Sequence, residues 1–160
     1  MALSKIDRYN TKAALDIYNG FIKQIDEDIV FQSKGVSSSY IVPNIYLAKA
    51  RFMAFALKKF DISSVEEISA MYEKSANSAA ERNDAITQQF VLLGYADFLA
   101  GQNNIAKAEE VFKIFSAQKT EAMVIENFKT GDIKVIWPGL AYLYTKSKTV
   151  QDFITKFNVK

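Results

Sequence analysis

Residues 40–60 read YIVPNIYLAKARFMAFALKKF and include the most apolar stretch of the chain. On a helix, the apolar side chains of this segment are not confined to one stripe but surround nearly the whole circumference. A helix that is apolar on all sides is buried by its neighbours, so residues 41–60 are predicted to form the central helix of the fold. Pro43 fits the first turn of this helix, where its missing backbone N–H does no harm.

An amphipathic pattern precedes the central helix. Apolar side chains recur at steps of three and four between residues 14 and 25, which predicts a helix of roughly four turns. Its opposite face carries charged side chains: Lys12, Asp16, Lys23 and Asp26. The polar residues 32–39 are predicted to form the loop that joins this helix to the central one.

Capping signals predict further helices after the central one. Ser64 and Glu67 have the spacing of a capping box, so a helix is expected to start there and to run to Arg82. Either Asn83 or Asp84 is expected to cap the following helix. The connections are short, so neighbouring helices are expected to be antiparallel.

The next connection is predicted to turn at a glycine. Gly101 is expected to end the preceding helix in the left-handed conformation. Either Asn103 or Asn104 then caps another helix. The buried face of that helix is predicted to consist of Ile105, Ala108, Val111, Phe112 and Phe115. Altogether the pattern predicts an all-α fold, which is either an antiparallel bundle or a short array of helical hairpins. We expect about six to eight helices in a single domain that spans residues 1–160.

The run LGYADFLAGQNNIAKAEEVF at residues 93–112 resembles one tetratricopeptide unit. It has small residues where two helices would cross, a glycine at the turn, and an alanine followed by an aromatic residue. No second copy follows at that family's period. The resemblance implies helix-hairpin packing in the middle of the chain and carries over no ligand-binding residues.

Two interpretations stay open for residues 123–137. β-Branched residues flank Gly131, which favours a small β-hairpin, but a helix ending at Gly131 explains the same residues equally well. Beyond them, Thr149 and Asp152 have capping-box spacing and predict a last amphipathic helix. Residues 149–160 are therefore a candidate docking arm, with an apolar face made of Val150, Phe153, Ile154 and Phe157.

The chain contains no Cys and no His. Thiol nucleophiles, Cys–His metal sites and imidazole acid–base catalysis are therefore excluded. The carboxylates fall at predicted helix ends or on solvated faces, and no glycine-rich phosphate loop occurs. The sequence therefore predicts a chain that is not an enzyme, with no catalytic residue, no cofactor and no metal site. With no signal peptide and no membrane-spanning segment visible, we expect a cytoplasmic location and no membrane partner.

The net charge of +2 does not by itself indicate a nucleic-acid partner. Basic residues nevertheless gather toward the two ends of the chain, and phosphate contacts need only clustered positive charge. The candidate nucleic-acid contacts are Lys49, Arg51, Lys58, Lys59, Lys146, Lys148 and Lys156. On this alternative, the protein would be a coat-like or nucleoprotein-like assembly subunit.

The favoured expectation is a non-catalytic structural or protein-interaction subunit. Of the residues in the chain, 49% are hydrophobic and 13% are aromatic. This is more aromatic side chain than the core of a small helical bundle needs. Such helix faces either close the core or meet another protein. The sequence therefore predicts self-association or docking of a protein partner through helix faces.

Overall fold

The structure is a computed structural model that describes residues 11–35, 41–117 and 147–157. These ranges contain six helices and no strand, which confirms the predicted all-α fold. The chain divides into two compact units, Met1–Asp84 and Ala85–Lys160, and each is described by itself. The expectation of one domain stays a prediction, and the choice between hairpin and helix at 123–137 lies outside the described residues.

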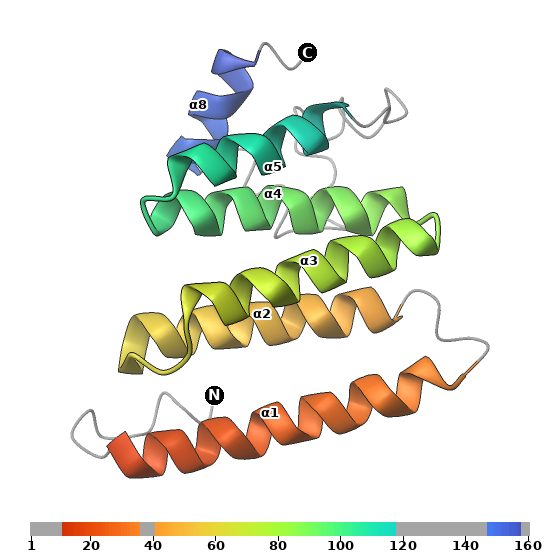
Figure 1. Cartoon of the computed structure of the whole chain (residues 1–160), viewed down its shortest axis with the longest axis vertical. Helices are drawn as coiled ribbons and strands as arrows, with labels where there is room; N and C mark the ends of the chain where they lie inside the picture. The colour runs from red at the N-terminus through yellow and green to blue at the C-terminus, as the bar shows by residue number, and fades with distance from the viewer. Residues whose placement is uncertain (1–10, 36–40, 118–146, 158–160) are drawn as a thin grey trace. The chain divides into compact units, whose positions relative to one another are not determined.

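The first unit contains three helices: α1 at Thr11–Ser33, α2 at Ile41–Phe60 and α3 at Val65–Glu81. Successive helices are antiparallel, as predicted, and α2 packs against both of its neighbours (Figure 1). Within this unit α2 is thus the middle helix. The buried core residues on the three helices include Ala14, Tyr18, Ile29, Leu47, Ala50, Met53, Ile68, Tyr72 and Ala79.

Helix α1 is longer than the sequence pattern predicts. It continues through Gln32 and Ser33, which were expected to lie in a loop. Ile29 is buried and prolongs the apolar stripe by another turn, so packing supports helix where the local composition indicates loop. The Ser33 hydroxyl donates to the carbonyl of Ile29 at 2.7 Å, a bond that serine side chains make within helices.

The start of α3 confirms the predicted capping box. The Glu67 backbone N–H donates to Ser64 Oγ at 3.2 Å, and the Ser64 N–H donates to Glu67 Oε2 at 3.1 Å. Two amides that would otherwise lack helical partners are therefore bonded. Further along α3, the buried Ser75 hydroxyl donates to the carbonyl of Pro43 at 2.7 Å and joins α3 to the first turn of α2.

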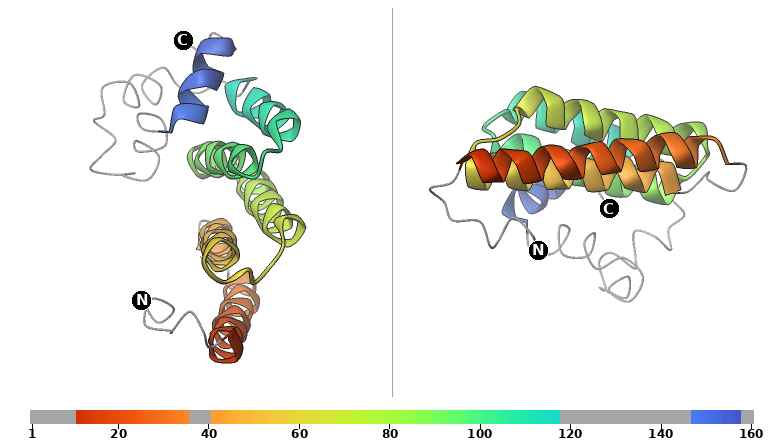
Figure 2. Two further views of the ribbon diagram at one scale, coloured as in Figure 1. Left: turned by 90° about the vertical axis from the view of Figure 1, so that its left-hand side faces the viewer. Right: turned by 90° about the horizontal axis from the view of Figure 1, so that it is seen from below.

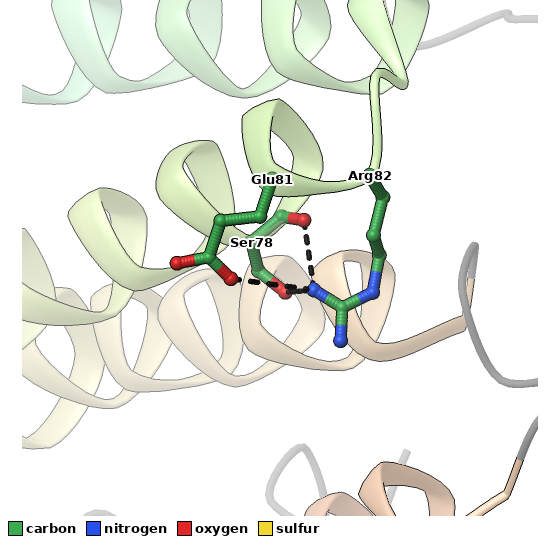
Figure 3. Close-up of polar contacts among 3 residues, drawn as sticks. All are labelled: Ser78, Glu81 and Arg82. Carbon is green, nitrogen blue, oxygen red and sulfur yellow. Dashed lines mark hydrogen bonds and ion pairs between the residues drawn. The ribbon is translucent and has the colours of Figure 1, made fainter.

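Arg82 holds the other end of α3 (Figure 3). Its Nη1 donates to the carbonyl of Ser78 at 2.9 Å and to the hydroxyl of the same residue at 2.6 Å. The Glu81 carboxylate lies 3.8 Å from the same nitrogen. A cation that binds a carbonyl in the last turn stabilises a helix end, so this contact stabilises the end of α3, and Asn83, with a φ of 55°, follows outside the helix.

The second unit contains α4 at Ala85–Gly101, α5 at Ile105–Ala117 and α8 at Lys148–Lys156. Helices α4 and α5 form an antiparallel hairpin (Figure 1), which is the packing that the tetratricopeptide resemblance implies. Every residue of α4 from position 89 to 96 is buried, whereas α2 leaves Phe55 40% exposed. Burial on all sides, predicted for residues 41–60, is therefore more complete in α4.

The turn between α4 and α5 corrects the predicted role of Gly101. That glycine is the last helical residue, and Asn103 is the residue with positive φ, at 60°. Asparagine tolerates the left-handed region because its short amide bonds locally, so the turn needs no glycine there. Asn104 Oδ1 accepts the Lys107 N–H at 3.4 Å, which identifies Asn104 as the cap of α5. On the predicted buried face of α5, Ile105 is 45% exposed and the other four residues are buried.

Helix α8 begins earlier than predicted. Its cap is Ser147, whose hydroxyl accepts the Val150 N–H at 3.2 Å and also donates to Asp97 on α4. The cap was expected at Thr149, but Ser147 is the residue that also bonds to α4. The ring of Phe153 lies 5.3 Å from that of Phe112, which packs α8 against α5. None of the helices in these described ranges is long and apolar enough to cross a membrane.

Candidate interaction surface

The face of α1 that meets α2 is occupied by ring contacts. Tyr18 stacks on Phe52, with ring centroids 5.6 Å apart and planes inclined by 10°. Phe21 contacts the same ring at 5.6 Å. These contacts bury large apolar areas and account for the way α1 packs in the first unit.

An ion pair completes this inner face. Lys49 Nζ lies 2.5 Å from Asp26 Oδ1, and the lysine side chain is only 11% exposed. An ammonium removed from water needs such a carboxylate, because the loss of its hydration is otherwise uncompensated. Lys49 therefore joins α2 to α1.

Tyr18 carries a perturbed hydroxyl. Burial raises its pKa above the ordinary value of about 10. A hydrogen bond with the Ser63 side chain opposes this increase, while the negative charges of Glu67 and Asp26 add to it. The Tyr18 hydroxyl therefore stays neutral where it packs inside the first unit.

The opposite face of α1 carries a regular stripe, which we call the outer stripe. Its members recur at alternating steps of four and three residues and lie on the side of the helix away from Tyr18, given 3.6 residues per turn. It consists of Asp16, Gly20, Lys23, Glu27 and Val30 on α1 and of Lys34 in the turn directly after it, all exposed. Seen from below in Figure 2, α1 lies in front of α2.

A shallow hollow of about 590 Å³ extends along α1 from the outer stripe toward the face that meets α2. The described residues that line it belong to α1, except Lys34, which directly follows the helix: Asn19, Ile22, Lys23, Asp26, Glu27, Val30, Phe31 and Lys34. Val30 is 55% exposed and Phe31 is 72% exposed, the highest values among the large hydrophobic side chains described. The hollow therefore combines exposed apolar groups with charges of both signs.

Comparison of the chain with known protein families, with curated proteins and with solved structures finds no match. The likeness of residues 93–112 to a tetratricopeptide unit is thus a likeness of local pattern.

The apolar residues predicted as a partner surface lie on α8 and just after it. Val150 and Phe153 are buried within the second unit, whereas Ile154 and Phe157 are half-buried. The Phe157 ring lies 5.8 Å from that of Phe112 and has the ammonium groups of Lys113 and Lys156 over its face. Only Ile154 and Phe157 therefore have surface left with which to contact a partner.

The predicted nucleic-acid contacts in the described residues lie on α2 of the first unit and on α8 of the second. Lys49 is engaged with Asp26, and Lys156 Nζ lies 2.5 Å from Glu109 Oε1. Arg51, Lys58, Lys59 and Lys148 are exposed, and Lys146 lies outside the described residues. A nucleic-acid interface stays a prediction from the sequence.

The polar groups elsewhere in the described residues include few buried ones. The part of the chain that the structure describes has no cluster of three or more acidic residues able to hold a metal ion. The side-chain oxygen Gln89 Oε1 is buried on α4 without a hydrogen-bond partner. A lone amide oxygen supplies neither a nucleophile nor a proton donor, so it offers no chemistry by itself.

Sequence reasoning missed Val30 and Phe31 because it ended the first helix one to two turns too early. The signal was present: Ile25, Ile29 and Gln32 continue the inner stripe at steps of four and three. Following that stripe past Ile25 would have placed Val30 and Phe31 on the helix and away from its packed face.

Proposed function

We propose that this chain is a non-catalytic protein-interaction subunit that binds a helical partner through the outer face of α1. The observation that carries the proposal is the exposure of Val30 and Phe31, at 55% and 72%, beside an open hollow. Exposed apolar groups that adjoin a polar rim are typical of interaction sites.

The energetic reason is the cost of leaving these side chains in water. Burying one large apolar side chain stabilises a complex by roughly 1.5–3 kcal/mol. On the inner face, Tyr18, Phe21 and Ile29 already supply contacts within the unit. The proposal assigns the outer apolar pair to contact with another protein.

The shape and charge of the hollow favour a protein over other ligands. It is shallow and follows one helix, whereas small molecules bind in enclosed pockets. Its charged residues, Lys23, Asp26, Glu27 and Lys34, balance in sign, whereas a phosphate backbone needs an excess of positive charge. A second amphipathic helix presents apolar and charged groups at matching spacing.

Site-specific photocrosslinking in cells tests this proposal. A photoreactive residue placed at position 34 should form one protein adduct of defined mass, because Lys34 borders Phe31 on the hollow. The same probe in a Phe31→Asp background should lose that adduct. As a matched control, the probe at the exposed position 110 on α5 should give none.

The adduct at position 34 decides the outcome. An adduct that persists at full yield in Phe31→Asp, or the absence of any adduct above the level at position 110, would refute recognition through this face. Circular dichroism of Phe31→Asp provides the folding control, since Phe31 is mostly exposed and its replacement should leave the helix content unchanged.

A further inference from the structure

The charges along the outer stripe are self-complementary. In order, Asp16, Gly20, Lys23, Glu27, Val30 and Lys34 read negative, small, positive, negative, apolar and positive. Reversing the order and exchanging the signs reproduces the charge pattern. A stripe with this property can pair with an antiparallel copy of itself about a two-fold axis.

We infer that the partner at this surface is a second copy of the chain, with its α1 antiparallel and the two-fold axis passing between Lys23 and Glu27 on the outer stripe. This inference rests on the proposed function and names its partner. In this register Asp16 lies opposite Lys34 of the second copy, and Lys23 lies opposite Glu27 of the second copy. By symmetry each contact occurs twice, so every charge of the stripe faces an opposite charge.

The same register brings the smallest residue opposite the apolar ones. Gly20 lies opposite Val30 of the second copy, with Phe31 at its edge. A β-carbon built on Gly20 would meet nothing within 4 Å, so the helix surface is open at this point. Because Gly20 has no side chain, the two helices can approach closely at this point, and Val30 of the second copy fills the space beside it.

Other registers of the stripe are disfavoured by charge. A shift of one heptad in one direction places Lys23 opposite Lys34 of the second copy. The same shift in the other direction places Asp16 opposite Glu27. Like charges placed opposite each other penalise both alternatives, so the stripe specifies one register as well as one partner.

The chemistry also predicts the strength of the dimer and how it responds to salt. Charged residues outnumber apolar ones on the stripe, and a helix-to-helix contact of this kind lies near the small end of specific interfaces. We therefore expect a weak dimer, with a dissociation constant on the order of micromolar or above. Because exposed ion pairs are screened by salt, association should weaken between low and physiological ionic strength.

Sedimentation equilibrium of the full chain at low salt tests the inference. The unmodified chain should show a monomer–dimer equilibrium. Asp16→Lys and Lys34→Glu should each weaken dimerisation at least tenfold, because each places like charges together twice. The double variant Asp16→Lys/Lys34→Glu restores opposite charges and should recover dimerisation. As a matched control, Asp28→Lys has the same charge change on α1 away from the outer stripe and should dimerise like the unmodified chain.

Mixing the two single variants gives the sharpest outcome. The chain with Asp16→Lys has lysines at both positions and the chain with Lys34→Glu has acids at both, so the mixture should form a heterodimer that neither forms alone. Dimerisation unaffected by the single changes, or no recovery in the double variant and the mixture, would overturn the inference. A monomeric chain whose position 34 crosslinks to a different protein would also overturn it, while leaving the proposed function intact.

Discussion

At the scale of single residues, the connection between α4 and α5 separates two roles that sequence reasoning gave to one glycine. Gly101 is helical, and a β-carbon there would meet nothing within 4 Å, whereas Asn103 has a φ of 60°. We expect Gly101→Ala to raise the unfolding free energy by about 0.5–1 kcal/mol, since alanine favours helix. Asn103→Ala should lower it by about 1 kcal/mol, because alanine is strained at positive φ.

Urea denaturation followed by circular dichroism measures both effects. Asn103→Gly supplies the control, because glycine accepts positive φ and should cost much less than alanine. Destabilisation by Gly101→Ala together with a neutral Asn103→Ala would mean that the glycine, and not the asparagine, is the left-handed residue.

Tyr18 gives a pH-dependent prediction at the same scale. Its pKa is raised mainly by burial, so the folded chain holds the phenol proton more tightly than the unfolded chain does. The stability that this difference supplies is present below the ordinary tyrosine pKa of about 10 and is lost as pH rises through the raised pKa. The Ser63 hydrogen bond should make the unmodified chain about 1 kcal/mol more stable than Tyr18→Phe at neutral pH.

Unfolding free energies of the two proteins between pH 7 and about 11 test this prediction. The advantage of the unmodified chain over Tyr18→Phe should shrink above pH 10, and other tyrosines cancel in the comparison. An advantage that stays constant, or that grows with pH, would contradict a raised pKa at Tyr18.

At the scale of elements, a local capping signal located the start of α3, whereas the end of α1 and the start of α8 were misplaced. The capping box of Ser64 and Glu67 is a short-range geometric pattern, and the structure reproduces it. The end of α1 was missed although Ile29, which is buried, continues the apolar periodicity of the helix. The cap of α8 was misplaced for a different reason, because Ser147 bonds to Asp97, 50 residues away. A tertiary contact of this kind leaves no mark in a local window.

The candidate interaction surface was also predicted only in part. Asp16 and Lys23 were recognised as part of a polar face, because they belong to the segment where the periodicity was clear. Val30 and Phe31 were not, because the apolar periodicity was followed only to Ile25 and the residues between it and the predicted loop at 32–39 were left unassigned. The sequence analysis therefore predicted α1 too short, and for that reason it missed the apolar end of the outer stripe.

At the scale of the whole molecule, the chain divides into two compact units. We expect a dimer formed through α1 to stabilise the unit that contains α1, because ligand binding stabilises the state that binds. The apolar periodicity of the sequence predicted the all-α architecture, but the division into two units depends on which helices contact each other. These contacts are set by long-range packing, which periodicity does not reveal.

Hydrogen exchange of the full chain at low salt tests this unit-specific effect. If exchange from α1 requires the monomer, mass action predicts protection that rises about threefold for each tenfold increase in chain concentration once the dimer dominates. Amides of α5, in the second unit, should show no such dependence. In Lys34→Glu the α1 amides should become independent of concentration as well. Equal gains in α1 and α5, or an undiminished concentration dependence in Lys34→Glu, would show that association occurs elsewhere than at the outer stripe.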